Sequence, residues 1–345
     1  MSKQRSATPE TPAHEPSRTE HRSAPSERGG FDARVGPATA VSAVIAVQVA
    51  AYAAVAAVGR PTLYVPVAVG SAALLGWRTD DGWFGVVTAT LGSLLVLALG
   101  LPLLAFAFQL DPGLVAAAAG RPAVHRMLFV TVYAPVLAAG VATVGGVPLA
   151  YLLARGFTGA AVVQSLVDLP LVVPHSVAGI VVLFGFGRGG VFPSVPILSS
   201  LPGVVLALVF VSAPYVVAAT RDAFAAVDDD LRRAARSQGA SPFETFRRVT
   251  LPLAKRGVVT GGVLAWARGV SEFGAVAVVA YTVQLFVPGV GQVTAQHAPV
   301  FVYTTYTSRG LAEGGAVAAV LLVVSAGIFL LVRWVTDGDG IGVVR

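Results

Sequence analysis

The sequence predicts an all-α, polytopic membrane protein, and three observations support this fold class. Only 12% of the residues are charged, whereas ordinary soluble domains carry roughly 25%. Hydrophobic residues make up 55% of the chain and fall in long uninterrupted blocks. These blocks have the length that a bilayer requires, because a helix needs about 20 apolar residues to cross the hydrocarbon layer.

Apolar segments that could span the membrane follow one another along most of the chain. They cover 36–59, 62–77, 83–108, 127–154, 163–187, 202–220, 257–282 and 312–334. Pro66 interrupts the second segment, and Pro170 and Pro174 break the start of the fifth. Prolines at membrane depth are tolerated where neighbouring helices satisfy the freed backbone groups. We therefore expect a membrane helix from each of these segments.

The two ends of the chain are expected to lie outside the helical part. Residues 1–34 are rich in Ser, Pro, Glu and Arg, and Phe31 is almost their only apolar side chain. Such a segment cannot bury enough apolar surface to fold, so we expect a disordered cytoplasmic tail. It is too long to be the charged start of a signal peptide. Residues 337–345 are expected to form a second cytoplasmic tail.

The placement of arginine and lysine predicts the orientation. The segment 221–256 is rich in lysine and arginine, whereas Arg309 is the only such residue in the loop 283–311. The basic residues of the first segment are Arg221, Arg232, Arg233, Arg236, Arg247, Arg248, Lys255 and Arg256. The positive-inside rule places this segment in the cytoplasm and the loop outside. An even number of spans then leaves both termini on the cytoplasmic side of the cell (plasma) membrane.

The composition also excludes several kinds of site. The chain has no cysteine, which rules out disulfides, thiolate metal sites and cysteine nucleophiles. We expect no metal centre, because the histidines lack the spacing of metal ligands; they are His14, His21, His125, His175 and His297. The net charge of +6 reflects basic cytoplasmic loops and not an affinity for nucleic acid.

The segment 228–252 predicts a helix, a glycine corner and a second helix. Its three leading aspartates suit a helix N-terminus, and the arginines that follow suit the C-terminal half. Gly239 stands where a helix would end in the left-handed conformation. Ser241, Pro242 and Glu244 then restart a helix as an N-cap, a first-turn proline and a reciprocal cap.

The second helix of this corner is expected to place Phe243 and Phe246 on one face, and Pro252 to close the segment. A rigid, capped projection of this kind suits docking in a groove on a partner. The alternative is a solvated helical hairpin that only connects two spans. These physical arguments favour the two interpretations about equally.

The same segment resembles the EAA motif of binding-protein-dependent ABC importer permeases. That motif reads Glu-Ala-Ala, three residues, Gly, nine residues and then Ile-x-Leu-Pro. Here Arg233-Ala234-Ala235 precedes Gly239, and Val249-Thr250-Leu251-Pro252 follows in the same register. Arg233 departs from the family's glutamate, so it would need an acidic partner. The resemblance implies an ATPase-coupling loop formed by Arg233, Ala234, Ala235, Gly239, Ala240, Ser241, Pro242, Phe243, Val249, Leu251 and Pro252.

A permease of this kind takes its energy from another subunit. Lys3 and Lys255 are the only lysines, and neither lies in the Gly-x4-Gly-Lys-Ser/Thr setting of a P-loop. The chain is therefore expected to be a transport subunit, not an enzyme, and to bind no cofactor. The resemblance implies a separate nucleotide-binding ATPase that holds ATP and Mg, an extracellular oxyanion-binding protein, and a homodimer of permeases in the lipid bilayer.

Two further stretches resemble tungstate/molybdate permeases, particularly the archaeal tungstate type. They are Ala-Arg-Gly-Val-Ser-Glu-Phe-Gly within 267–281 and Leu-Pro-Leu-Val-Val-Pro-His-Ser within 169–180. Sulfate permeases carry a similar Gly-Glu-Tyr-Gly segment, so sulfate or another small oxyanion is an alternative substrate. The resemblance covers about 83–335. It implies a six-helix type I ABC importer permease core at 81–336, with 35–80 as an N-terminal extension of about two transmembrane helices.

Arg268 and Glu272 stand out because a charge at mid-membrane costs about 2.5–3.5 kcal/mol on insertion scales. Their i, i+4 spacing would put them on one helix face, where they could neutralise each other. They would either line the pathway or brace a gate, or else form a structural ion pair between helices. Ser271 and Gly274 beside them permit close helix approach.

His175 and Ser176 follow Pro174 at the broken start of a span. The N-terminus of a half-helix could face a passing oxyanion there, and a capped helix start in contact with water is the alternative. The full set of pathway and gate candidates is Pro174, His175, Ser176, Arg268, Ser271, Glu272, Phe273 and Gly274.

Two other classes of function compete with an importer. An intramembrane enzyme, such as a protease or a lipid transferase, would need a polar catalytic constellation at membrane depth. Arg268, Glu272 and His175 are the candidates for one, and no nucleophile–base pair is recognisable among them. A passive channel or scaffold would leave the capped corner without a partner.

Overall fold

The computed structural model describes residues 48–77, 82–187, 189–191, 196–287 and 291–338. The tail expected at 1–34 lies outside these described residues. Of the C-terminal tail expected at 337–345, Asp337 and Gly338 belong to the last helix, and 339–345 lie outside the described residues. The chain is mostly helical, as predicted. It divides into two compact units between Ser93 and Leu94, within helix α3 (Gly82–Gln109).

The first unit is built from apolar helices. The Tyr64 hydroxyl donates a hydrogen bond to the Gln48 side chain at 2.9 Å, and the Tyr52 and Tyr64 rings meet edge to face. The prediction that Pro66 interrupts this segment is wrong. Pro66 lies in the first turn of its helix, where no backbone N–H is needed for a hydrogen bond. The described elements are the helix Gln48–Ala57, the 3-10 turn η1 (Pro61–Leu63), α2 (Tyr64–Trp77) and the start of α3.

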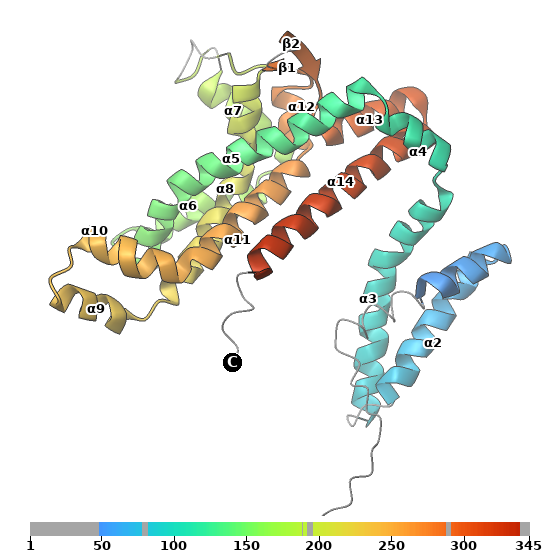
Figure 1. The fold of residues 1–345 in the computed structure, drawn as a ribbon, viewed down its shortest axis with the longest axis horizontal. Coiled ribbons are helices and arrows are strands. Elements are labelled where there is room, and N and C mark those ends of the chain that lie inside the picture. Colours follow the sequence, from blue (N-terminus) through green and yellow to red (C-terminus); the bar gives the residue numbers. More distant parts are fainter. Residues whose placement is uncertain (1–47, 78–81, 188, 192–195, 288–290, 339–345) are drawn as a thin grey trace, which may run out of the picture. The chain divides into compact units, whose positions relative to one another are not determined.

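The second unit contains the rest of α3 from Leu94 on, and its described residues add further helices and one β-hairpin (Figure 1). Its elements are α4 (Pro112–Ala119), α5 (Pro122–Arg155), α6 (Ala160–Val172), α7 (His175–Phe186), α8 (Leu201–Ala225), α9 (Asp229–Ser237), α10 (Pro242–Thr245), the π-helical turn η2 (Phe246–Thr250), α11 (Leu251–Val270), α12 (Gly274–Val279), β1 (Val283–Val287), β2 (Gly291–Ala295), α13 (Ala298–Arg309) and α14 (Leu311–Gly338).

Four helices among the described residues are long and apolar enough to cross a membrane. They are α3, α5, α8 and the Leu311–Leu330 part of α14. Two of the predicted spans are instead broken into pairs of shorter helices. The span 163–187 is divided between α6 and α7, and the span 257–282 between α11 and α12.

The break between α6 and α7 has a local cause. Val173 is extended, with φ −73° and ψ 129°, because the ring of Pro174 excludes the helical conformation for the residue before it. Pro170 is buried inside α6, and the helix continues beyond it to Val172, so Pro170 does not end that helix. The broken start predicted for this span therefore lies at Val173 and Pro174.

Helices α5, α8 and α11 pack along one another and form the centre of the second unit. Gly257 on α11 lies so close to α8 that an added Cβ would come within 2.2 Å of the Ala223 methyl group. Gly261, one turn further, would meet the Val216 backbone at 3.1 Å. Small residues at these positions let two membrane helices approach closely.

The hairpin β1–β2 was not predicted from the sequence. Val283 and Leu285 are buried and Gln284 and Phe286 exposed, which is the alternation of a half-buried strand. The Gln284 N–H donates to the Ser199 carbonyl at 3.1 Å, so the hairpin extends onto the connection between α7 and α8. Figure 1 places this hairpin at one end of the α5–α8–α11 bundle and α9 with α10 at the other. We name these the hairpin end and the corner end.

Candidate functional site

The corner end is built by local capping. Asp228 caps α9 by accepting a hydrogen bond from the Asp230 N–H at 2.8 Å. After α9 the backbone turns at Gly239, whose φ of +90° lies in the left-handed region that favours glycine. The helix, its cap and the glycine corner agree with the sequence prediction.

Ser241 and Glu244 form the predicted capping box at the start of α10. The Glu244 N–H donates to the Ser241 hydroxyl at 3.2 Å, and the Ser241 N–H donates to the Glu244 carboxylate at 2.9 Å. Hydrogen bonds from Ser241 to the Glu244 carboxylate hold the pKa of Glu244 below its ordinary value. The backbone N–H has the larger effect and the hydroxyl the smaller one. Pro242 occupies the first turn, so the start of α10 is pre-organised by interactions within four residues.

Two expectations for this segment are wrong. Pro252 does not close the segment, because η2 leads directly into α11 and Pro252 lies in the first turn of that helix. Phe243 and Phe246 do not share a face: Phe243 is 68% exposed, whereas Phe246 packs edge-on against Tyr151 at 4.9 Å between ring centroids. Packing against the helical bundle, and not the spacing along α10, decides the direction of Phe246.

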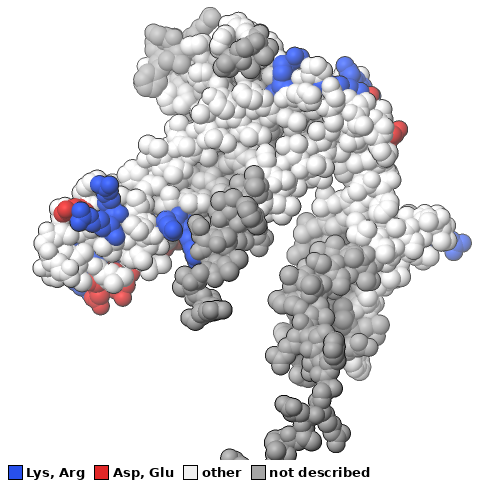
Figure 2. All heavy atoms as spheres, in the orientation of Figure 1, with Lys and Arg blue, Asp and Glu red and all other residues white. Residues whose placement is uncertain are grey.

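Phe246 attaches the corner to the helical bundle. Its ring also lies 5.9 Å from that of Phe224 on α8, which is fully buried. The corner is thus anchored by one aromatic cluster and presents Phe243 outward. Figure 2 shows basic and acidic side chains together at this end of the molecule.

The second candidate region lies where α11 ends and α12 begins. Arg268 and Glu272 form an ion pair with 2.7 Å between Nη2 and Oε2, and Glu272 is fully buried. The pairing was predicted, but on one continuous helix. In the structure α11 ends at Val270, and Glu272 lies in the break, where its Oε1 accepts a hydrogen bond from the Ala275 N–H at 2.8 Å.

His175 joins this pair from the start of α7. Its Nε2 lies 2.8 Å from the Arg268 guanidinium, and its Nδ1 lies 3.5 Å from the Glu272 carboxylate. Residues 93 positions apart in the sequence are therefore in contact. About half of the His175 side chain (48%) is exposed, whereas 16% of that of Arg268 is.

Glycines permit this close approach of α7 and α12. A Cβ on Gly274 would lie 2.8 Å from the Cβ of His175, and one on Gly179 would lie 2.7 Å from the Ala275 carbonyl oxygen. Both distances are too short for a real Cβ atom, so a larger residue at either position would force the two helices apart. The two half-helices therefore meet at glycines on both sides of the contact.

The remaining gate candidates lie around the trio without joining it. Ser271 is exposed and donates its hydroxyl to the Arg268 carbonyl at 3.0 Å. Phe273 packs edge-on against Tyr303 of α13, with ring centroids 5.4 Å apart. Pro174 and Ser176 flank His175 at the exposed N-terminus of α7.

Two buried polar residues beside the break were missed by sequence reasoning. His297 is fully buried, and neither of its ring nitrogens has a hydrogen-bond partner among the described residues. Thr131 on α5 accepts a hydrogen bond from the Ala298 N–H at 2.8 Å and donates to the Met127 carbonyl. Single His and Thr residues beside apolar runs carry no recognisable spacing, so no sequence signal identified them.

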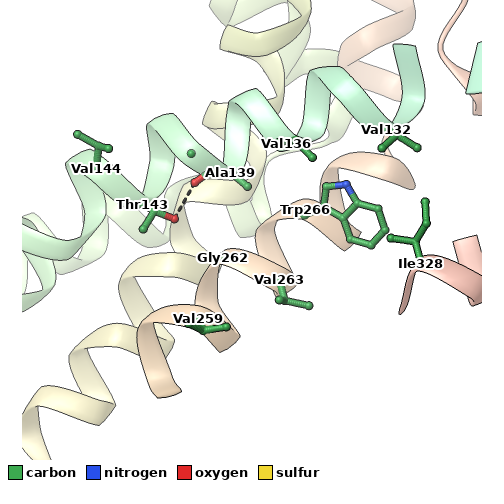
Figure 3. Close-up of a pocket in the computed structure, with 11 residues that line it drawn as sticks. Val132, Val136, Ala139, Thr143, Val144, Val259, Gly262, Val263, Trp266 and Ile328 are labelled. Atoms are coloured by element: carbon green, nitrogen blue, oxygen red, sulfur yellow. Dashed lines mark hydrogen bonds between the residues drawn. The ribbon is translucent and has the colours of Figure 1, made fainter. Parts of the chain in front are cut away.

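An apolar groove of about 520 Å³ lies between α5, α11 and α14. Figure 3 shows Val136, Val263 and Trp266 beside it, and Ile328 contributed by α14. The lining side chains are aliphatic or aromatic except Thr143, whose hydroxyl is engaged by the Ala139 carbonyl at 2.7 Å. Trp266 carries the other polar atom, an indole nitrogen that is buried and has no hydrogen-bond partner among the described residues. The groove is therefore almost entirely apolar and is poorly suited to an anion.

Comparison with known proteins gives the class. A family described as binding-protein-dependent transport system inner membrane component matches residues 146–336. This match, together with the long apolar helices, defines a membrane permease. The chain belongs to the binding-protein-dependent transport system inner membrane component family.

Individual relatives agree with this family. The molybdate/tungstate transport system permease protein WtpB of Pyrococcus abyssi is 37% identical over 71% of this chain and 93% of its own length. The probable molybdenum ABC transporter permease protein of Haloferax volcanii is 39% identical over 73% and 90%. One chain of the inward-facing MetNI methionine ABC transporter shares the fold, with a TM-score of 0.50, 19% identity and coverage of 65% and 97%.

Proposed function

We propose that this chain is the transmembrane permease subunit of an ATP-driven importer for tungstate or molybdate. The relatives named for molybdate, tungstate or molybdenum transport support the substrate. The capped corner is the observation that carries the coupling role, because a pre-organised projection with an outward phenylalanine suits a groove on another subunit. Sulfate is the alternative substrate.

The importer requires partners that this chain does not provide. A separate nucleotide-binding subunit holds ATP and Mg and docks on the corner end, while the permease itself binds no nucleotide or metal. An extracellular binding protein delivers the oxyanion to the hairpin end. Two permeases form a homodimer around the pathway, and both termini lie in the cytoplasm, as the excess of arginine at the corner end suggests.

The contact between His175, Arg268 and Glu272 braces the gate. The carboxylate neutralises the guanidinium at 2.7 Å, so this site is unsuited to hold an oxyanion by charge. It joins the starts of α7 and α12, two half-helices with no continuous backbone between them. A shift of α11 that begins at the corner end would reach this contact directly through Arg268.

Co-purification with the cognate P-loop ATPase subunit tests the coupling role. The full-length chain in detergent is expected to retain the ATPase. Gly239→Val, which puts a β-branched residue at a positive φ, is expected to lose it while remaining monodisperse. Gly145→Val is the matched control, since Gly145 lies on an exposed helix face with open space around it. Failure of the wild-type chain to retain the ATPase would contradict the proposal.

A further inference from the structure

The arginines of α9 differ in how far their side chains are exposed. Arg232 pairs with Asp229 and has 18% of its side chain exposed, so it belongs to the packed side of the corner. Arg233 pairs with Asp230, and here 72% and 75% of the two side chains are exposed. An exposed pair at i, i+3 contributes little to stability, so the fold of α9 does not depend on Arg233.

Other exposed groups extend this surface. Arg236 follows Arg233 on the same face of α9, and Arg247 lies about one turn beyond Phe243. Phe243 itself is 68% exposed, although it is large and apolar. A single exposed aromatic residue among arginines has the composition of an interface anchor with a charged rim.

We propose that the nucleotide-binding subunit receives the corner in an acidic groove, with an apolar pocket for Phe243 and a carboxylate that pairs with Arg233. This inference rests on the proposed function and adds the chemistry of the partner's surface. In the free permease Asp230 holds the Arg233 guanidinium. On docking, the guanidinium exchanges that exposed carboxylate for one on the ATPase, in a less hydrated place where the pair is stronger.

An anionic lipid surface is a poorer occupant for the same groups. Carboxylates are interspersed with the arginines of the corner, at Asp228, Asp229, Asp230 and Glu244. Lipid phosphates would face these carboxylates as well as the guanidiniums, whereas an acidic groove can place its carboxylates opposite Arg233 and Arg236 alone. The capped backbone also fixes these positions relative to one another, as recognition by a protein requires.

Binding of the purified ATPase to the full-length permease in lipid-free detergent tests the proposal. Arg233→Glu is expected to weaken binding by about tenfold or more, because attraction becomes repulsion. Asp230→Asn is expected to strengthen binding a few-fold, because it releases Arg233, and wild-type binding should weaken as salt increases. Arg126→Glu is the control, since Arg126 is exposed near the start of α5 at the hairpin end.

The outcomes separate this inference from the proposed function. Wild-type binding with no effect of Arg233→Glu, Asp230→Asn or salt would overturn the acidic groove and leave the coupling role intact. An Arg233 effect seen only in nanodiscs that contain anionic lipid would assign the surface to lipid and overturn the inference equally. Absence of any wild-type binding would instead overturn the proposed function.

Discussion

Glu272 lies 2.7 Å from the Arg268 guanidinium although the end of α11 at Val270 separates the two residues. The carboxylate has two roles at this place. It neutralises a cation in an apolar helical bundle, and it accepts the Ala275 N–H at the start of α12. The ion pair therefore fixes the angle at which α12 leaves α11.

Removal of one member of this pair is expected to cost more stability than removal of both. Arg268→Met leaves Glu272 buried without its cation, which costs about 3–5 kcal/mol for a buried pair. Arg268→Met with Glu272→Gln should recover most of that loss, because a glutamine can still accept the Ala275 N–H. Thermal unfolding in detergent measures both, with Ser271→Ala as the near-neutral control. A double variant no more stable than Arg268→Met would contradict this account of the pair.

The same double variant tests the gate. A purely structural pair predicts a stable protein that still transports. The proposed brace predicts a stable protein in which ATP hydrolysis continues and transport is lost, because α7 and α12 no longer move with α11. Normal uptake by the double variant would assign the pair a structural role alone.

The glycine contact between α7 and α12 gives a second prediction. Gly179→Ala would place a methyl group 2.7 Å from the Ala275 carbonyl oxygen, and overpacking of this kind costs about 1–3 kcal/mol. Gly185→Ala on the same helix meets open space and should be neutral or slightly stabilising. Thermal unfolding of the two variants side by side checks this, and equal unfolding temperatures would show that α7 is not held against α12.

Thr131 gives a third prediction, at the hairpin end. Thr131→Val keeps the side-chain shape but leaves the buried Ala298 N–H without its acceptor, at a cost of about 1–3 kcal/mol. Thr143→Val is the control, because Thr143 makes the same hydrogen bond to a carbonyl of α5 and the structure shows no donor to its hydroxyl. Unfolding free energies that fall equally in the two variants would contradict a tie between α5 and α13.

The capping box of the corner gives a fourth prediction, read by hydrogen exchange. Ser241→Ala removes an N-cap worth about 1 kcal/mol, so the Glu244 amide should exchange about fivefold faster at neutral pH. The pKa of Glu244 is lowered from 4.5, so the reciprocal bond is fully present above that value and is lost as the pH falls through the folded-state pKa. A protection factor at the Ser241 amide that is constant from neutral to strongly acidic pH would contradict the cap.

The local structure of the corner could be predicted because its determinants are short-range. Ser241, Glu244 and Gly239 specify a cap and a left-handed turn within a few residues, and the structure has both. The direction of Phe246 could not be predicted. It depends on packing against Tyr151, which no local motif encodes.

The region where α11 ends and α12 begins shows the same limit for contacts between distant residues. The charges of Arg268 and Glu272 and their spacing predicted a pair, and the pair exists. The helix break at Glu272 was missed because it lies within a mostly apolar stretch, 257–282, that was interpreted as one span. The hairpin was missed because 283–311 was interpreted as a loop between two spans. The contact with His175 could not be predicted because it is a tertiary contact. Pro174 determines where α7 starts, but not which helix packs against that start.

Uptake of tungstate into proteoliposomes tests the central claim most directly. The full-length permease, its ATPase inside and tungstate-loaded binding protein outside should together give ATP-dependent accumulation, with sulfate as the competing substrate. Gly239→Val should abolish accumulation, and Gly145→Val should not. Tungstate accumulation without ATP, or no accumulation of either oxyanion with all partners present, would contradict the assignment as an ATP-driven oxyanion permease.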